Sequence, residues 1–346
     1  MRKCFLILLI LLQLCIPVQA LELSAPTLPN AAAEYMPSNP QNLQEGIGQV
    51  LKKAIHKFRP DLKEASKTCV GIVAAVMVVS LLLVLPGNGQ CIIDVVGVVA
   101  VSSMFLTSVG ALVNLGAQTV IEISEYGKLL LPVMTAALAA QGGITTSAAL
   151  YAGTALFDSL LSGLIGKVLV PMINLFLAIA VANGAVGDEM LKKLKDAVKW
   201  FMTWSLKIIL YVFTGFISIT GVVSGPTDAA ALKAAKLTIS GVVPVVGGIL
   251  SDASEAVLVS ASAVKNSIGL YGLFAVLALW LDPFLKIGAH YLMLRATGLV
   301  CSIIGSKQIS DLIQDFAAAM GYLLAMTGAV CLLLLISTVC FMRGVS

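Results

Sequence analysis

The sequence has few charged residues. Only 12% of its 346 residues are Asp, Glu, Lys or Arg, whereas a soluble domain carries about 25%. Hydrophobic residues make up 59% of the chain, and its mean hydropathy is +0.99. Apolar segments of roughly 20 residues, the length that crosses a hydrocarbon core of about 30 Å, fill most of it. This composition argues against a soluble globular protein and predicts an all-α polytopic membrane protein.

Histidine is nearly absent, and the cysteines form no metal-binding pattern. His56 and His290 are the two histidines, and the seven cysteines contain no C-x-x-C pair. These features argue against a metal site or a disulfide framework. The phosphate-binding, zinc-protease and serine-hydrolase signatures G-x-x-x-x-G-K-[ST], H-E-x-x-H and G-x-S-x-G are missing too. We therefore expect no catalytic, cofactor-binding or metal-binding residues, and no enzymatic activity.

The positive charge is small and scattered. The net charge is +4, and no basic block is interleaved with aromatic residues, so we expect no nucleic-acid partner. The lysines are more typical of anchors that flank helices in a lipid membrane.

The N-terminus has the pattern of a secretory signal peptide. Arg2 and Lys3 precede an apolar run, which ends in the small-residue sequence PVQA at residues 17–20. We predict a signal peptide over residues 1–20. An uncleaved signal anchor is the alternative, and it gives the same topology.

An extracytoplasmic region is expected over residues 21–67. Residues 21–40 are rich in Pro, Ala and Asn and predict an extended linker. Residues 43–67 have apolar positions near a helical repeat, with basic residues elsewhere. This pattern predicts an amphipathic helix that docks on a membrane surface or on a partner.

The remaining chain predicts membrane helices arranged partly as two repeats. The first transmembrane helices are expected within 68–126. Pro171 aligns with Pro283 at a spacing of 112, and GDEMLKKLKDAVKWFM, from Gly187, aligns with GSKQISDLIQDFAAAM, from Gly305, at a spacing of 118. We predict related repeats at 127–223 and 240–343, joined by a loop or helix at 224–239. Each is expected to end one helix near its proline. General likeness between helical membrane regions is the alternative, and the choice between inverted and parallel repeats is open.

Each predicted repeat begins with a segment interrupted by proline and glycine. Such paired breaks expose backbone groups and helix ends to a passing solute. The alternative is structural, because glycine permits close helix packing and proline introduces kinks. The six residues of these helix-break elements are Pro132, Gly142, Gly143, Pro244, Gly247 and Gly248.

A polar face follows the second break. Asp252, Glu255, Ser262 and Asn266 are separated by 3, 7 and 4 residues, spacings that keep them on one side of a helix. Intramembrane acids are typically functional or paired, so this face, together with Asp158, is a candidate polar path or gate. The alternative places the stretch SDASE at the membrane interface, where its acids would cap a helix.

Three segments resemble a known family. They are KLLLPVMTAALAAQGGITTSAAL from Lys128, LKAAKLTISGVVPVVGGILSDASEAVLVSASAVKNSIGLYGL from Leu232, and ISDLIQDFAAAM from Ile309. All three are similar to stage III sporulation protein AE of endospore-forming bacteria, over roughly residues 120–343. The stretch from Pro244 to Glu255 is the most specific part of the match.

The resemblance implies a multi-pass protein of the mother-cell membrane surrounding the forespore. Its implied partners are other stage III A operon proteins, including an ATPase and ring-forming subunits, and a forespore-side protein. It implies no catalytic residues. We therefore expect a non-enzymatic, permease-like component of a mother-cell-to-forespore channel. The alternatives are a scaffold that recruits channel subunits without conducting and a stand-alone secondary transporter of a small solute.

Overall fold

The computed structural model describes residues 26–28, 30–37, 43–84, 90–242, 247–304 and 307–343. Within these ranges the regular secondary structure is helical and turns connect the helices, which confirms the predicted all-α class. The helices are α2 (Asn30–Ala33), α3 (Leu43–Val84), α4 (Gln90–Ala139), α5 (Ile144–Leu164), α6 (Val170–Val186), α7 (Glu189–Val242), α8 (Gly247–Ile304) and α9 (Lys307–Arg343). A π-helical turn, Ile165–Leu169, joins α5 to α6. The predicted signal peptide lies outside the described residues.

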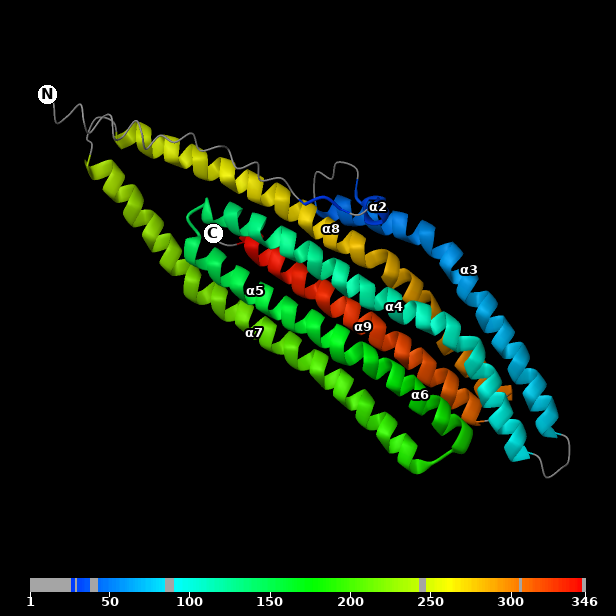
Figure 1. Ribbon diagram of the computed structural model, residues 1–346. Coiled ribbons are helices and arrows are strands. Elements are labelled where there is room, and N and C mark those ends of the chain that lie inside the picture. Colours follow the sequence, from blue (N-terminus) through cyan, green and yellow to red (C-terminus); the bar gives the residue numbers. More distant parts are fainter. Residues whose placement is uncertain are drawn as a thin grey trace.

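The long helices run back and forth beside one another as three hairpins (Figure 1). The hairpins are α3 with α4, α5–α6 with α7, and α8 with α9. Their tips lie at one end of the bundle, and the α4–α5 turn lies at the other. Helix α9 is central, because it packs against α4, α5, α6, α7 and α8.

Several of these helices are long and apolar enough to cross a bilayer. By length and composition, the described residues contain five such helices, or six if the two parts of α4, bent by 40° near residue 107, count as one span. Helices of 37 to 43 residues are about 55 to 65 Å long. That is roughly twice a hydrocarbon core of about 30 Å, so the bundle is longer than the membrane is thick.

The prolines do not end the helices as expected, which corrects the predicted breaks. Helix α4 continues through Pro132 to Ala139, and the chain turns only at residues 140–143. Gly142 has φ 92° there, a backbone conformation that favours glycine. Likewise, Pro283 lies inside α8, and Pro171 lies in the first turn of α6, which continues the α5 helix through the π turn. Proline is tolerated in membrane helices because neighbouring groups satisfy the freed backbone carbonyl.

The predicted amphipathic helix is the first half of α3, which continues directly into the first apolar span. Its small residues Gly46, Val50 and Ala54 are buried. The helices approach closely here, since a Cβ at Gly46 would collide with the Phe274 ring of α8. The larger apolar residues of this half of the helix point outward instead.

The predicted extended linker is docked in part on the bundle, so the prediction was wrong for residues 30–36. The Tyr35 side chain is buried, and its hydroxyl donates to Asp282 Oδ1 in α8 at 2.7 Å. Lys53 Nζ donates to the carbonyls of Met36 and Glu34 at 2.6 and 3.1 Å. Burial and the bond to Asp282 raise the pKa of Tyr35 well above its ordinary value. The phenol therefore stays a neutral donor and holds the segment down.

The hairpins α5–α7 and α8–α9 run in the same direction along the bundle (Figure 1). If these regions are repeats, they are parallel rather than inverted, because each region then crosses the membrane an even number of times. The predicted boundary between residues 126 and 127 falls inside α4, and the predicted connection at 224–239 falls inside α7. The relationship between the two regions stays a prediction.

Truncating a buried aromatic side chain of α9 should destabilise the bundle. Phe316 is 0% exposed and stacks on Phe105 of α4 with ring centroids 4.8 Å apart. We expect Phe316→Ala to lower the free energy of unfolding by about 3 to 5 kcal/mol through lost contacts and a cavity. Reversible unfolding in mixed micelles would measure this. Leu332→Ala on the same helix is the control, because Leu332 is 52% exposed and should change stability little. Equal effects would contradict the central position of α9.

Candidate functional site

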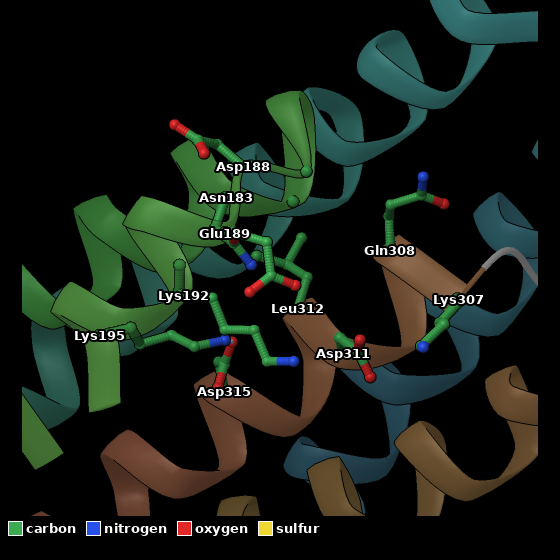
Figure 2. A pocket seen from close by; sticks show the side chains of 13 residues that line it. Asn183, Asp188, Glu189, Lys192, Lys195, Lys307, Gln308, Asp311, Leu312 and Asp315 are labelled. Atoms are coloured by element: carbon green, nitrogen blue, oxygen red, sulfur yellow. Dashed lines mark hydrogen bonds and ion pairs between the residues drawn. The ribbon is translucent and has the colours of Figure 1, made fainter. Parts of the chain in front are cut away.

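A charged hollow of about 270 Å³ lies at the hairpin-tip end of the bundle, between α6, α7 and α9 (Figure 2). Its walls carry both signs of charge. The acidic residues are Asp188, Glu189, Asp311 and Asp315, and the basic residues are Lys192, Lys195 and Lys307. Asn183 and Gln308 add neutral polar groups. Such a surface can bind a partner that itself presents charges of both signs.

Two residues, Gly187 and Asp188, shape the α6–α7 turn, which forms one wall of the hollow. Gly187 ends α6 with φ 71°, and its N–H donates to the Asn183 carbonyl at 2.7 Å. Asp188 Oδ1 accepts from the Met190 N–H at 3.0 Å and caps α7. Figure 2 shows the Asp188 side chain pointing away from the hollow, whereas Glu189 and Lys192 point towards α9. The turn therefore directs the first residues of α7 across the start of α9.

A buried ion-pair cluster forms the floor of the hollow. Lys195 Nζ lies 2.5 Å from Asp315 Oδ2, and Lys199 Nζ lies 3.2 Å from Asp315 Oδ1. The Lys195 and Asp315 side chains are only 9% and 7% exposed. Lys199 is more exposed and lies 5.3 Å from the centroid of the Phe176 ring. One carboxylate thus holds two ammonium groups and joins α7 to α9.

A second group of polar side chains lies farther along the bundle interior. Ser124 of α4 donates to Asp158 Oδ2 of α5 at 2.6 Å, and Ser162 Oγ lies 3.5 Å from Ser124 Oγ. One turn earlier in α5, Thr154 donates to Ser337 of α9 at 2.9 Å. Asp158 and Thr154 are buried. Polar side chains thus line contacts between three helices rather than facing lipid.

Asn266, the one residue of the predicted polar face whose side chain the structure describes, does not lie with this interior group. Asn266 is exposed on α8, while Asp158 is buried between α4 and α5. Asp252, Glu255 and Ser262 lie on the first part of α8, where the structure describes only the backbone. That part of α8 extends past the α4–α5 turn (Figure 1).

The predicted helix-break residues have different positions. Gly142 and Gly143 lie at the α4–α5 turn, and Gly247 and Gly248 begin α8. Pro132 lies inside α4, and Pro244 is outside the described residues. Of these predicted residues, the four glycines therefore lie at helix ends, whereas Pro132 does not.

The site residues predicted from the sequence did not include Lys195, Lys199 or Asp315. Their signal was available in the two aligned segments, because Lys195 and Lys199 flank the buried Val198 on α7, and Asp315 precedes the buried Phe316 on α9. A charge on the apolar face of an amphipathic helix predicts a buried partner. Among the described residues, no group of three or more His, Cys, Asp and Glu side chains is placed to hold a metal ion.

Comparison with known proteins places the chain in a family. The family model for stage III sporulation protein AE matches residues 41–344. The chain belongs to this family. Stage III sporulation protein AE of Bacillus subtilis (strain 168) is 23% identical over 233 residues, which cover 67% of this chain and 58% of that protein. The chain thus spans less than two thirds of that relative's length. No solved structure matches it.

The match to the stage III sporulation protein AE family covers the bundle but not the whole chain. It includes Asp158, Lys195 and Asp315. The docked segment with Tyr35 precedes the matched residues. The resemblance identified from the sequence is therefore confirmed, and the interior polar groups lie within the family region.

Removing one partner of the Lys195–Asp315 pair should cost more than removing both. Asp315→Met leaves Lys195 buried without its carboxylate and should lower stability by about 3 to 5 kcal/mol. The double variant D315M/K195M should recover much of this loss, because an apolar pair replaces both charges. A double-mutant cycle from reversible unfolding would measure the coupling. Additive losses would show that the pair is not coupled.

Proposed function

We propose that this chain is a non-enzymatic, permease-like membrane component of the mother-cell-to-forespore channel needed for endospore development. Its site would be the mother-cell membrane that surrounds the forespore. Membership of the stage III sporulation protein AE family supports the developmental role. The observation that carries the permease-like part is the set of polar and charged side chains buried inside a bundle of apolar helices.

The buried position of these groups favours a function in the bundle interior. A charge at the centre of a bilayer costs about 3 kcal/mol on insertion scales. Asp158 nevertheless lies between helices in the interior of α5, and Lys195 and Asp315 lie between α7 and α9 near the hairpin-tip end. Polar contacts between membrane helices also give the bundle alternative hydrogen-bond partners if those helices move. A polar route for a solute between the hairpins would be lined by such side chains.

The proposed channel requires partners. The sequence has no phosphate-binding motif, so ATP-driven work would come from a separate ATPase. Ring-forming subunits and a forespore-side protein of the same assembly would complete the conduit. The charged hollow at the α6–α7 turn gives these proteins a surface that offers both carboxylates and ammonium groups.

Loss of the gene should stop late forespore development. In a native spore-former that lacks this gene, we expect a late-forespore transcription reporter to fall after engulfment and the forespore to shrink. Restoring the gene should return the signal. An unchanged reporter in the deletion strain would contradict the channel role and direct attention to a stand-alone transporter.

The same strain tests the predicted polar face. Restoration with D252A/E255A should give a weaker reporter signal than the native gene, with an equal amount of protein in the membrane. Asp196→Ala, an exposed position on α7, is the control and should restore the signal fully. Full restoration by D252A/E255A would remove this face from the proposed path.

One observation favours the scaffold as a second candidate function. Ile47, Leu51 and Ile55 form an outward stripe on α3 and are 44%, 54% and 61% exposed. Lys52 and Arg59 are exposed near it. Because this half of α3 precedes the apolar span, the stripe has the character of a docking surface for a partner or a membrane surface.

The docking role of this stripe can be tested separately from any conduction through the bundle. If the scaffold function holds, I47S/L51S/I55S should remain in the membrane but lose co-purification with the other stage III A operon proteins. A variant that replaces Lys52 and Arg59 with Ser is the matched control for polar surface change and should lose less. Unchanged assembly in the stripe variant would exclude this docking role.

A further inference from the structure

The carboxyl group of Asp158 lacks the partners that a buried charge needs. The residue is 2% exposed, in the middle of α5. Its Oδ2 accepts one hydrogen bond, from Ser124 at 2.6 Å. Its Oδ1 is buried and has no hydrogen-bond partner. An ionised carboxylate offers about four lone-pair sites, so most of this acceptor capacity is unused.

Among the side chains that the structure describes, those packed against this part of α5 supply no close counter-charge. From α4, Ser124 faces the carboxyl group, and Lys128 follows one turn later with an exposed side chain. From α7, the rings of Phe213 and Phe216 pack beside Phe157. From α9, the nearby polar group is Ser337, which accepts from Thr154. The described surroundings of Asp158 are therefore apolar or neutral apart from Lys128, whose side chain is exposed.

Asp315 shows what the same bundle does with an ionised acid. It is buried to a similar degree, at 5% exposed, but both of its oxygens lie within 3.2 Å of lysine ammonium groups. The two aspartates thus have similar burial and opposite surroundings. An unpaired charge in a low-dielectric interior costs far more than a neutral hydroxyl that lacks one bond.

We propose that the Asp158 carboxyl group is a proton-binding site inside the helix bundle. The bound proton forms the O–H bond on Oδ1, while Oδ2 keeps the hydrogen bond from Ser124. Release transfers the proton to a water molecule and leaves the carboxylate, which then needs further donors. Water can supply these donors only if α4 and α5 separate, so proton release is linked to opening of the α4–α5 contact.

A hydrophobic carbodiimide distinguishes the two aspartates in the full-length protein. N,N′-dicyclohexylcarbodiimide reacts with a protonated carboxyl group in an apolar site. The acid proton moves to one nitrogen, the carboxyl oxygen bonds to the central carbon, and an oxygen-to-nitrogen shift gives a stable N-acylurea with no atom lost. The purified protein in lipid nanodiscs would be treated at several pH values, and mass spectrometry of its peptides would locate the adduct.

We expect Asp158 to be labelled at least roughly tenfold faster than Asp315, the ratio that corresponds to one pH unit of difference in protonation. Labelling should fall as the pH rises, and D158N should abolish it at this position. S124A removes the donor to the carboxylate, so it should extend labelling to higher pH. D158N keeps the shape of a protonated side chain and serves as the folded control.

Infrared spectroscopy gives a readout that does not depend on reagent access. The wild-type protein should show a protonated-carboxyl carbonyl band that is lost in D158N and kept in D315N. Absence of both the adduct and this band would overturn the proposal. Protection of Asp158 from labelling by sodium at constant pH would also overturn it, because a metal cation would then occupy the site. Both measurements use the isolated protein, so their result is independent of the sporulation reporter.

Discussion

The absence of water inside a bilayer is the constraint on which this structure depends. Backbone groups in that environment must be satisfied within the chain, and the helices of the described residues meet this requirement. Side-chain polar groups face the same demand. Lys195 and Asp315 satisfy it by pairing between α7 and α9, and Thr154 and Ser337 satisfy it by a hydrogen bond between α5 and α9. Asp158 has one donor for two oxygens, and protonation is the simplest way to meet the constraint there.

The central position of α9 follows from the composition of its faces. Apolar residues such as Phe316, Met320 and Leu334 are buried around most of the helix, so several neighbours are needed to cover it. Helix α7 buries a much smaller share of its apolar span, and its Trp200 and Trp204 are exposed. A helix covered on all sides supports the bundle, whereas one covered on a single side can meet lipid or another protein.

The sequence predicted the helical class and the family because both depend on long-range composition and on specific local motifs. It predicted Asp158 as a polar interior candidate because an acid within an apolar segment is unusual. The helix break expected at Pro132 was wrong. Proline in a sequence shows that a backbone N–H is missing, but it does not show whether neighbouring groups in the bundle compensate for that loss. The prediction from the sequence also missed Lys195 and Asp315, whose pairing joins residues 120 positions apart. Such a contact depends on how the hairpins pack, and the local pattern of each segment does not identify the distant partner.

The interior polar contacts have a common position in the topology. Ser124–Asp158 joins the first hairpin to the second, and Thr154–Ser337 and Lys195–Asp315 join the second to the third. If the hairpins moved as rigid bodies, these contacts would therefore be the ones to change. Thr154 and Ser337 can exchange one neutral partner for water at little cost, whereas separating Lys195 from Asp315 exposes two charges to a poorly solvated interior. Movement of the first hairpin against the second, at the Ser124–Asp158 contact, should therefore be easier than movement of the second against the third, which the Lys195–Asp315 pair holds together beneath the charged hollow.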